Sequence, residues 1–281
     1  MLDLMDSIYR SAPGETAIRD WCLDQLDSWA VDHRCERVEA AGVETHLVIA
    51  GHQGRDTVVF VAGDRFNAAA CLSLLTVLAT GFRVVAADVP GQSGLSAGHA
   101  GPEATLSWYG AWLGEVVAQT GSPSCLLFGH SFGGAVTLSC DSPLVRGRLA
   151  VSTGGLCRLR VTPAVVADFA AWAVFPRPAT SRRLLRRLMG PGQTPRPELV
   201  GWMTLVARHT RPVSTSETAR TYRNVPTIIA TGEADVFLPP SRLAPATRAA
   251  FDSDLRVIAG AGHLVTEERP EDLLTLVKQL V

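Results

Sequence analysis

Residues 129–134 read Gly-His-Ser-Phe-Gly-Gly, and they could make Ser131 a nucleophile. The apolar run 124–128 precedes them and a helix-like run follows. A strand, a tight turn with serine at its apex and a helix form a nucleophile elbow. Gly129 and Gly133 stand two residues before and after the serine, where larger side chains would clash. The helix start would also direct unpaired N–H groups and a positive dipole end at an oxyanion beside the serine.

A serine nucleophile needs a base, and the base needs an acid that orients it. With an elbow of this type the chain order is Ser, then Asp or Glu, then His. Asp235 follows the strand-like run 225–231, and His263 follows a second such run, 255–259. Because open parallel sheets place their sites beyond the carboxyl ends of strands, we expect both side chains beside Ser131.

Three motifs in this order resemble those of the α/β-hydrolases of the esterase, lactonase and carbon–carbon-bond hydrolase type. They are Gly-His-Ser-Phe-Gly-Gly, Gly-Glu-Ala-Asp at 232–235 and Gly-Ala-Gly-His at 260–263. The resemblance covers about residues 36–281. The segment 88–96 is also family-like, although it is one residue longer than the common form.

The resemblance implies an α/β-hydrolase fold, in which helices flank a mostly parallel central sheet. It also implies a serine esterase mechanism with Ser131 as nucleophile, His263 as base and Asp235 as acid. Glu233 stands two residues before Asp235 and is an alternative acid, but the family favours the aspartate position. No cofactor and no metal is implied.

The chain departs from the family after its third strand, where His-Gly is usual and Ala62-Gly63-Asp64-Arg65 stands instead. The residue after that glycine normally gives one backbone N–H to the oxyanion hole. Here the two donors would be Asp64 and Phe132. A carboxylate beside a developing oxyanion is unfavourable unless it points away or is paired, and Arg65 could pair with it.

The chain divides into three parts by pattern. Residues 1–35 predict a helix pair packed on the core, and 36–154 with 223–281 predict the α/β core itself. Residues 155–222 fit no strand and are broken by prolines, so they predict an inserted helical lid. If the lid covers the serine, its apolar side chains would line a pocket. The candidate substrate-binding residues are Arg65, His130, Trp172, Trp202 and Met203.

Composition excludes several classes of protein. The net charge of −1 gives no electrostatic footprint for nucleic acid, and no apolar run is long enough to span a membrane. The six scattered cysteines lack metal-ligand spacing, and the acidic start lacks the basic region of a secretory signal. We therefore expect a cytoplasmic protein that binds no metal.

Arg182 and Arg186 stand at helical i, i+4 spacing in the predicted lid. They indicate either a basic patch for an acidic carrier protein or a solvated face. The N-terminal helices could also serve a homodimer contact.

The favoured function is hydrolysis of a carboxylic ester, lactone or thioester of an apolar small molecule, through an acyl-enzyme. Two alternatives stay open. The same triad could serve carbon–carbon hydrolysis, a lyase or cyclase reaction, or acyl transfer, because Ala62 replaces the usual histidine. A ligand-binding, receptor-like module is the other alternative, although binding alone does not need the aspartate and histidine together.

Overall fold

A computed structural model describes residues 7–101, 104–212, 219 and 225–281. Among these residues one eight-stranded sheet runs through the molecule in the order β1-β2-β4-β3-β5-β6-β7-β8. The strands are β1 (His33–Ala40), β2 (Val43–Ala50), β3 (Thr57–Val61), β4 (Arg83–Ala87), β5 (Cys125–His130), β6 (Val145–Val151), β7 (Thr227–Gly232) and β8 (Arg256–Ile258). The pairs β1·β2 and β2·β4 are antiparallel and the other neighbours are parallel. The predicted mostly parallel sheet is confirmed.

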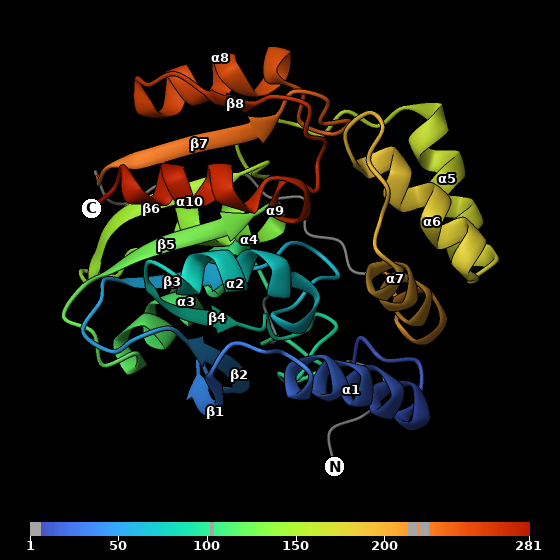
Figure 1. The fold of residues 1–281 in the computed structure, drawn as a ribbon, viewed down its shortest axis with the longest axis horizontal. Helices are drawn as coiled ribbons and strands as arrows, with labels where there is room; N and C mark the ends of the chain where they lie inside the picture. The colour runs from blue at the N-terminus through green and yellow to red at the C-terminus, as the bar shows by residue number, and fades with distance from the viewer. Residues whose placement is uncertain (1–6, 102–103, 213–218, 220–224) are drawn as a thin grey trace.

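Helices cover both faces of the sheet (Figure 1). They are α1 (Ala12–Asp27), α2 (Leu72–Ala79) after the 3₁₀ turn η1 (Ala69–Cys71), α3 (Leu106–Gln119), α4 (Phe132–Ser139), α5 (Pro163–Val174), α6 (Pro178–Leu188), α7 (Pro197–His209), α8 (Pro240–Phe251), α9 (Val265–Glu268) and α10 (Pro270–Lys278). Helices α2 and α10 pack together over one face, and α3 and α4 pack together over the other. Within the described residues, no helix combines the length and the apolar character needed to cross a bilayer.

Strand β3 shows how the sequence divides its apolar residues between the two faces. Val58 and Phe60 belong to the core under α2, whereas Val59 and Val61 belong to the core under α3 and α4. A strand buried on both faces needs apolar residues at every position, because successive side chains point to opposite sides. The continuous apolar run of β3 satisfies this requirement.

A buried arginine holds the helix that follows the elbow. Arg148 of β6 is fully buried, and it donates from Nε to the Thr137 carbonyl at 3.2 Å and from Nη2 to the Cys140 carbonyl at 2.8 Å. These carbonyls lie at the C-terminal end of α4, where a cation is favourable. The opposite end of α4 is thereby fixed against the carboxyl end of β5.

The N-terminal region differs from the expected helix pair. The described part contains one helix, α1, and the sheet already begins at His33 with β1. Strand β1 lies at the sheet edge and carries charged residues at four of its eight positions. Its pattern is too polar to predict a strand, because an edge strand can expose most of its side chains. The first six residues of the predicted pair lie outside the described residues.

Residues 155–212 carry α5, α6 and α7, which pack against one another beyond the carboxyl ends of the strands (Figure 1). Helix α7 also packs on α1. The role of this segment as a lid stays a prediction.

Candidate active site

Ser131 lies at a strained turn between β5 and α4. Its backbone has φ 54° and ψ −113°, a conformation that costs about 1–3 kcal/mol in a residue other than glycine. The Ser131 N–H donates to the Val151 carbonyl at 2.9 Å, which anchors the turn to β6. A Cβ on Gly133 would lie 2.2 Å from the Val61 carbonyl oxygen, and one on Gly129 would lie 2.3 Å from the Gly133 oxygen. Both glycines are therefore required by close backbone contacts.

The structure brings Ser131, His263 and Asp235 into one hydrogen-bonded chain. The His263 Nε2 lies 3.0 Å from the Ser131 Oγ, and its Nδ1 lies 2.9 and 3.1 Å from the two Asp235 carboxylate oxygens. A carboxylate only accepts, so Nδ1 carries the proton and the neutral ring accepts at Nε2. The hydroxyl of Ser131 can then donate to His263.

Asp235 is fixed by its own turn. Its Oδ1 accepts from the backbone N–H groups of Phe237 and Leu238, both at 2.9 Å, and its Oδ2 accepts from Thr231 Oγ1 at 3.1 Å. Burial favours a higher pKa for this carboxyl. The charge of His263 and these hydrogen bonds outweigh burial, so the pKa is held well below its usual range. The carboxylate stays ionised and faces the ring that would become an imidazolium.

His130 holds the backbone of His263. Its Nε2 donates to the His263 carbonyl at 2.8 Å, and the side chain is almost fully buried. The His263 N–H in turn donates to the Leu188 carbonyl at the end of α6, at 2.6 Å. Burial, followed by repulsion from a charged His263, lowers the pKa of the His130 imidazole to about 3. His130 is one of the candidate substrate-binding residues and borders the cavity, so its contact with substrate stays a prediction beside this structural hydrogen bond.

Asp64 and Arg65 lie on the loop after β3, opposite the elbow. Arg65 has a positive φ of 63°, and its N–H donates to Gln92 Oε1 at 3.1 Å. The Arg65 carbonyl accepts from Trp202 Nε1 at 2.9 Å. Its guanidinium forms an ion pair with Asp64 and lies over the ring of Trp172, 5.6 Å from the centroid. Hydrogen bonds to its N–H and to its carbonyl therefore hold Arg65 in the left-handed conformation.

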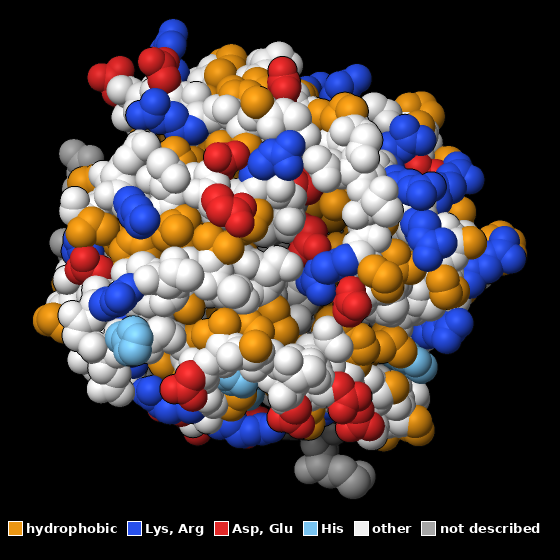
Figure 2. All heavy atoms as spheres, viewed as in Figure 1, with side chains coloured by type: hydrophobic (Ala, Val, Ile, Leu, Met, Phe, Trp, Pro, Cys, Tyr) orange, Lys and Arg blue, Asp and Glu red, His pale blue; other side chains and the backbone are white. Residues whose placement is uncertain are grey.

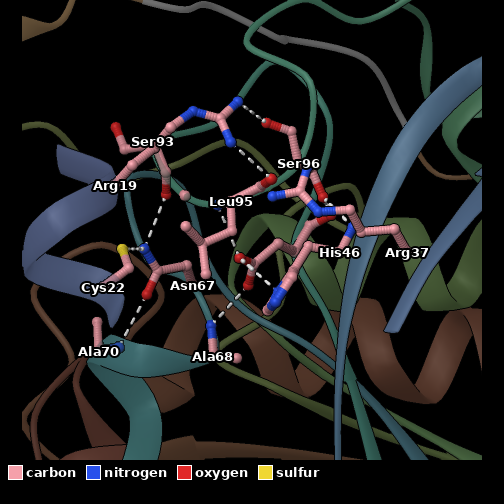
Figure 3. A network of polar contacts seen from close by, with 12 residues as sticks. Arg19, Cys22, Arg37, His46, Asn67, Ala68, Ala70, Ser93, Leu95 and Ser96 are labelled. Carbon is pink, nitrogen blue, oxygen red and sulfur yellow. Dashed lines mark hydrogen bonds and ion pairs between the residues drawn. The ribbon is translucent and has the colours of Figure 1, made fainter. Parts of the chain in front are cut away.

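The loop 88–96, which carries Gln92, is held in place by the network of hydrogen bonds in Figure 3. The buried Asp88 carboxylate accepts from the N–H groups of Ala68 and Leu95, at 2.8 and 3.0 Å. Arg19 of α1 donates to the carbonyls of Leu95 and Ser96, at 3.1 and 3.2 Å. Helix α1 therefore helps to position the loop that holds Arg65.

The N–H groups of Phe132 and Asp64 remain available. Phe132 opens α4, where N–H groups have no acceptor within the helix. Neither N–H has an acceptor among the described residues, and both residues line the same cavity as Ser131.

The Asp64 carboxyl keeps about a third of its side-chain surface exposed (35%). Burial raises the pKa of that carboxyl, although attraction to Arg65 partly opposes the shift.

A cavity of about 930 Å³ opens over Ser131. Its wall includes His263 and two of the candidate substrate-binding residues, Arg65 and Met203. The large apolar side chains of the wall come from separate parts of the chain: Phe66, Leu106, Phe132, Leu156, Leu159, Phe169, Leu188 and Leu264.

Trp172 and Trp202 are not among the wall residues that the structure describes. Trp202 is fully buried and bonds to Arg65, while Trp172 donates to the Met203 carbonyl at 2.9 Å and packs beneath the Arg65 guanidinium. The two indoles support the wall from behind. Their N–H groups need buried acceptors, and the backbones of Arg65 and Met203 supply them.

Several site residues were missed by the sequence analysis. Gln92 and Phe237 belong to loops that follow strands, and the Phe237 ring stands edge-on to His263 with centroids 4.9 Å apart. Leu106 opens α3 and Leu156 follows β6. Their position beyond the ends of strands was a usable signal, but residue type alone did not distinguish them.

The model of the alpha/beta hydrolase family matches residues 58–276. The chain belongs to this family. No curated protein sequence matches it. It is therefore an α/β-hydrolase.

Solved structures are similar at low identity. The carboxylesterase CesB from Bacillus subtilis has a TM-score of 0.79 at 16% identity and covers 96% of this chain and 98% of its own. The naproxen esterase from Bacillus subtilis has a TM-score of 0.80 at 17% identity and covers 96% and 99%. The 2-hydroxy-6-oxo-6-phenylhexa-2,4-dienoate hydrolase from Rhodococcus sp. strain RHA1 has a TM-score of 0.65 at 20% identity and covers 89% and 99%. These likenesses confirm the α/β-hydrolase fold.

The buried neutral His130 predicts a specific dependence of stability on pH. Its pKa is depressed in the folded protein, so its contribution is present above the ordinary value of 6.5 and is lost as the pH falls toward 3. The variant His130→Gln keeps an N–H donor but does not titrate. Between about pH 7.5 and about pH 5, the wild type should lose about 2 kcal/mol more unfolding free energy than this variant.

Urea unfolding at the two pH values measures the difference. His52→Gln, on an exposed loop, is the matched control and should follow the wild type. Equal losses in the wild type and His130→Gln would contradict a buried neutral His130.

Proposed function

We propose that this protein is a serine hydrolase that cleaves a carboxylic ester, lactone or thioester of an apolar small molecule. The observation that carries the proposal is the hydrogen-bonded chain from Ser131 through His263 to Asp235, at the floor of an apolar cavity. A family of hydrolases gives the general reaction, and this geometry supplies a nucleophile, a base and an orienting carboxylate. Each of the three groups has a role that ligand binding alone would not require.

The proposed reaction has two halves. His263 Nε2 takes the hydroxyl proton as Ser131 Oγ attacks the carbonyl carbon, and the carbonyl electrons move to its oxygen. When the tetrahedral intermediate collapses, His263 returns the proton to the leaving alcohol or thiol, and an acyl-serine remains. Water then attacks the acyl group with the same base, and the acid is released. Asp235 stabilises the imidazolium in both halves.

The oxyanion would be held by the N–H groups of Phe132 and Asp64. Two such donors typically contribute a few kcal/mol to lowering the barrier. The N-terminus of α4 adds its positive dipole end. The ion pair with Arg65 compensates the Asp64 carboxylate at the point where negative charge develops.

The wall of the cavity supports an apolar substrate. Leucine, phenylalanine and methionine supply nine of the twenty described wall residues, and the charged side chains in it belong to Asp64, Arg65 and Arg158. Two of the similar structures, the carboxylesterase CesB and the naproxen esterase, are esterases, which supports the choice of an ester. Cytoplasmic location, function without a cofactor and homodimer formation remain predictions from the sequence.

A fluorophosphonate should label the protein once, and Ser131→Ala should abolish both the label and ester turnover while the fold is kept. Intact-mass analysis reads the label, and product analysis checks that acid and alcohol appear together. Turnover by the pure, folded Ser131→Ala variant would contradict the proposal. Products formed without consumption of water would favour a lyase reaction instead.

The Asp64–Arg65 ion pair predicts a charge-dependent defect. In Arg65→Gln the carboxylate loses its compensation, so turnover of a soluble ester should fall by about tenfold or more. The loss should grow as the pH rises through the Asp64 pKa, because only the ionised carboxylate repels the oxyanion.

The second variant, Asp64→Asn with Arg65→Gln, should recover most of the turnover and lose the added pH dependence. Asp64→Asn alone is the control for the backbone of the loop. If the double variant were as slow as Arg65→Gln at every pH, Arg65 would act by some means other than compensating Asp64. Measurement of kcat and KM across pH, for the wild type, the two single variants and the double variant, distinguishes these outcomes.

A further inference from the structure

The outer face of α5 is entirely apolar. The exposed residues of this helix recur at intervals of three and four, so they form one stripe: Pro163, Ala164, Val166, Ala167, Ala170, Ala173 and Val174. Surface helices normally turn charged and polar residues outward. The one charged residue of α5, Asp168, does the opposite and is buried at 1% exposure.

The apolar stripe continues beyond both ends of α5. Leu159 and Val161 precede the helix with 50% and 61% exposure, and Phe175 follows it with 57%. Within α5, Val166 and Val174 are exposed at 52% and 67%. Five of the eight exposed large apolar side chains of the described residues thus lie between 159 and 175. Such clustering marks an interaction site.

Helix α6 packs beside α5 and gives the surface its charge. Arg183 and Arg187 pair with the buried Asp168 at 2.5 and 2.8 Å, which ties the two helices together. Arg182 and Arg186 are exposed and have no acidic partner among the described residues. In Figure 2 basic side chains gather over α5 and α6 at the right of the view. We call these exposed surfaces of α5 and α6, with residues 158–161, the α5–α6 face.

Charge is distributed unevenly along the chain. Residues 155–212 contain ten arginines but two carboxylates, Asp168 and Glu198. The whole chain carries a net charge of −1, so the rest of the molecule is acidic. Six of these arginines belong to the α5–α6 face, which carries no exposed acid, so an anionic partner is attracted to this face more than to the rest of the molecule.

The cavity over Ser131 opens next to this face. Arg158 and Leu159 line the cavity and are also exposed, so they mark its mouth just before α5. Phe169 of α5 lines the cavity from the inner side of the same helix. A molecule held on the outer face would lie beside the entrance.

A second copy of the chain does not suit this face. A two-fold interface would bring the same arginines against each other, with no acids on the face to separate them. An acidic protein would satisfy the arginines, but a protein interface also needs hydrogen bonds around its rim. On the α5–α6 face only the arginines could form them, since the exposed stripe of α5 carries no polar side chain.

We propose that the α5–α6 face docks on an anionic lipid surface. The apolar stripe would enter the boundary between headgroups and acyl chains, and Arg182 and Arg186 would contact lipid phosphates. An apolar ester dissolved in the lipid would then reach Ser131 through the mouth beside Leu159. This last step rests on the proposed hydrolase function, but docking itself does not.

Co-sedimentation with vesicles tests docking without reference to catalysis. Vesicles of phosphatidylcholine alone are compared with vesicles of phosphatidylcholine and phosphatidylglycerol. The wild type and Ser131→Ala should bind the anionic vesicles equally, and binding should weaken as salt is added. Val166→Asp with Val174→Asp should lower the apparent affinity about tenfold or more, and Arg182→Gln with Arg186→Gln should also weaken binding.

The matched control is Leu23→Asp with Val257→Asp, since these side chains are 45% and 47% exposed on α1 and β8. The control should bind as the wild type does, and all variants except Ser131→Ala should hydrolyse a soluble ester normally.

Absence of binding to anionic vesicles, or an equal loss of vesicle binding in the control, would overturn the proposal. If vesicles fail to bind and Arg182→Gln with Arg186→Gln impairs only a carrier-bound ester, the partner is an acidic protein instead. Vesicle binding without any ester hydrolysis would contradict the proposed function and leave the docking proposal supported.

Discussion

The strained backbone at Ser131 is the constraint on which the rest of the site depends. A Cβ at Gly133 would lie only 2.2 Å from the Val61 carbonyl oxygen, so the start of α4 can approach β3 this closely only where that position has no side chain. That packing also brings the loop after β3 to the elbow. The position of the proposed nucleophile and the positions of both proposed oxyanion donors follow from one close contact between backbones.

The groups around Ser131 are held by hydrogen bonds between side chains and backbone. His130 fixes the carbonyl of His263, Gln92 fixes the N–H of Arg65, and Trp202 fixes its carbonyl. Each bond joins a side chain to backbone, so each determines the course of a loop. The segment 155–212 takes part through Trp202 and through the Leu188 carbonyl, which accepts from His263. The helices beyond the sheet therefore support the base as well as the cavity wall.

The fold and the three central residues could be predicted because their signals are local. The elbow needs glycines at fixed spacing, and Asp235 and His263 follow apolar strands. Strand β1 could not be predicted, since an exposed edge strand has no apolar pattern. The positions of Trp172 and Trp202 depended on which backbone acceptors lay within reach of their N–H groups, and only the packing of α5 and α7 decides that. The apolar outer stripe of α5 could not be predicted either, because the sequence of an apolar helix does not say which of its faces meets the core.

The most direct test of the account is whether an acyl group resides on Ser131 during turnover. The reaction with a p-nitrophenyl ester is quenched within the first turnover and the intact protein is weighed. Nucleophilic catalysis by Ser131 predicts a rapid release of nitrophenol and a mass increase of one acyl group, which peptide mapping places on Ser131. Turnover with no acyl-protein, under conditions in which nitrophenol is released faster than acid, would contradict nucleophilic catalysis by this serine.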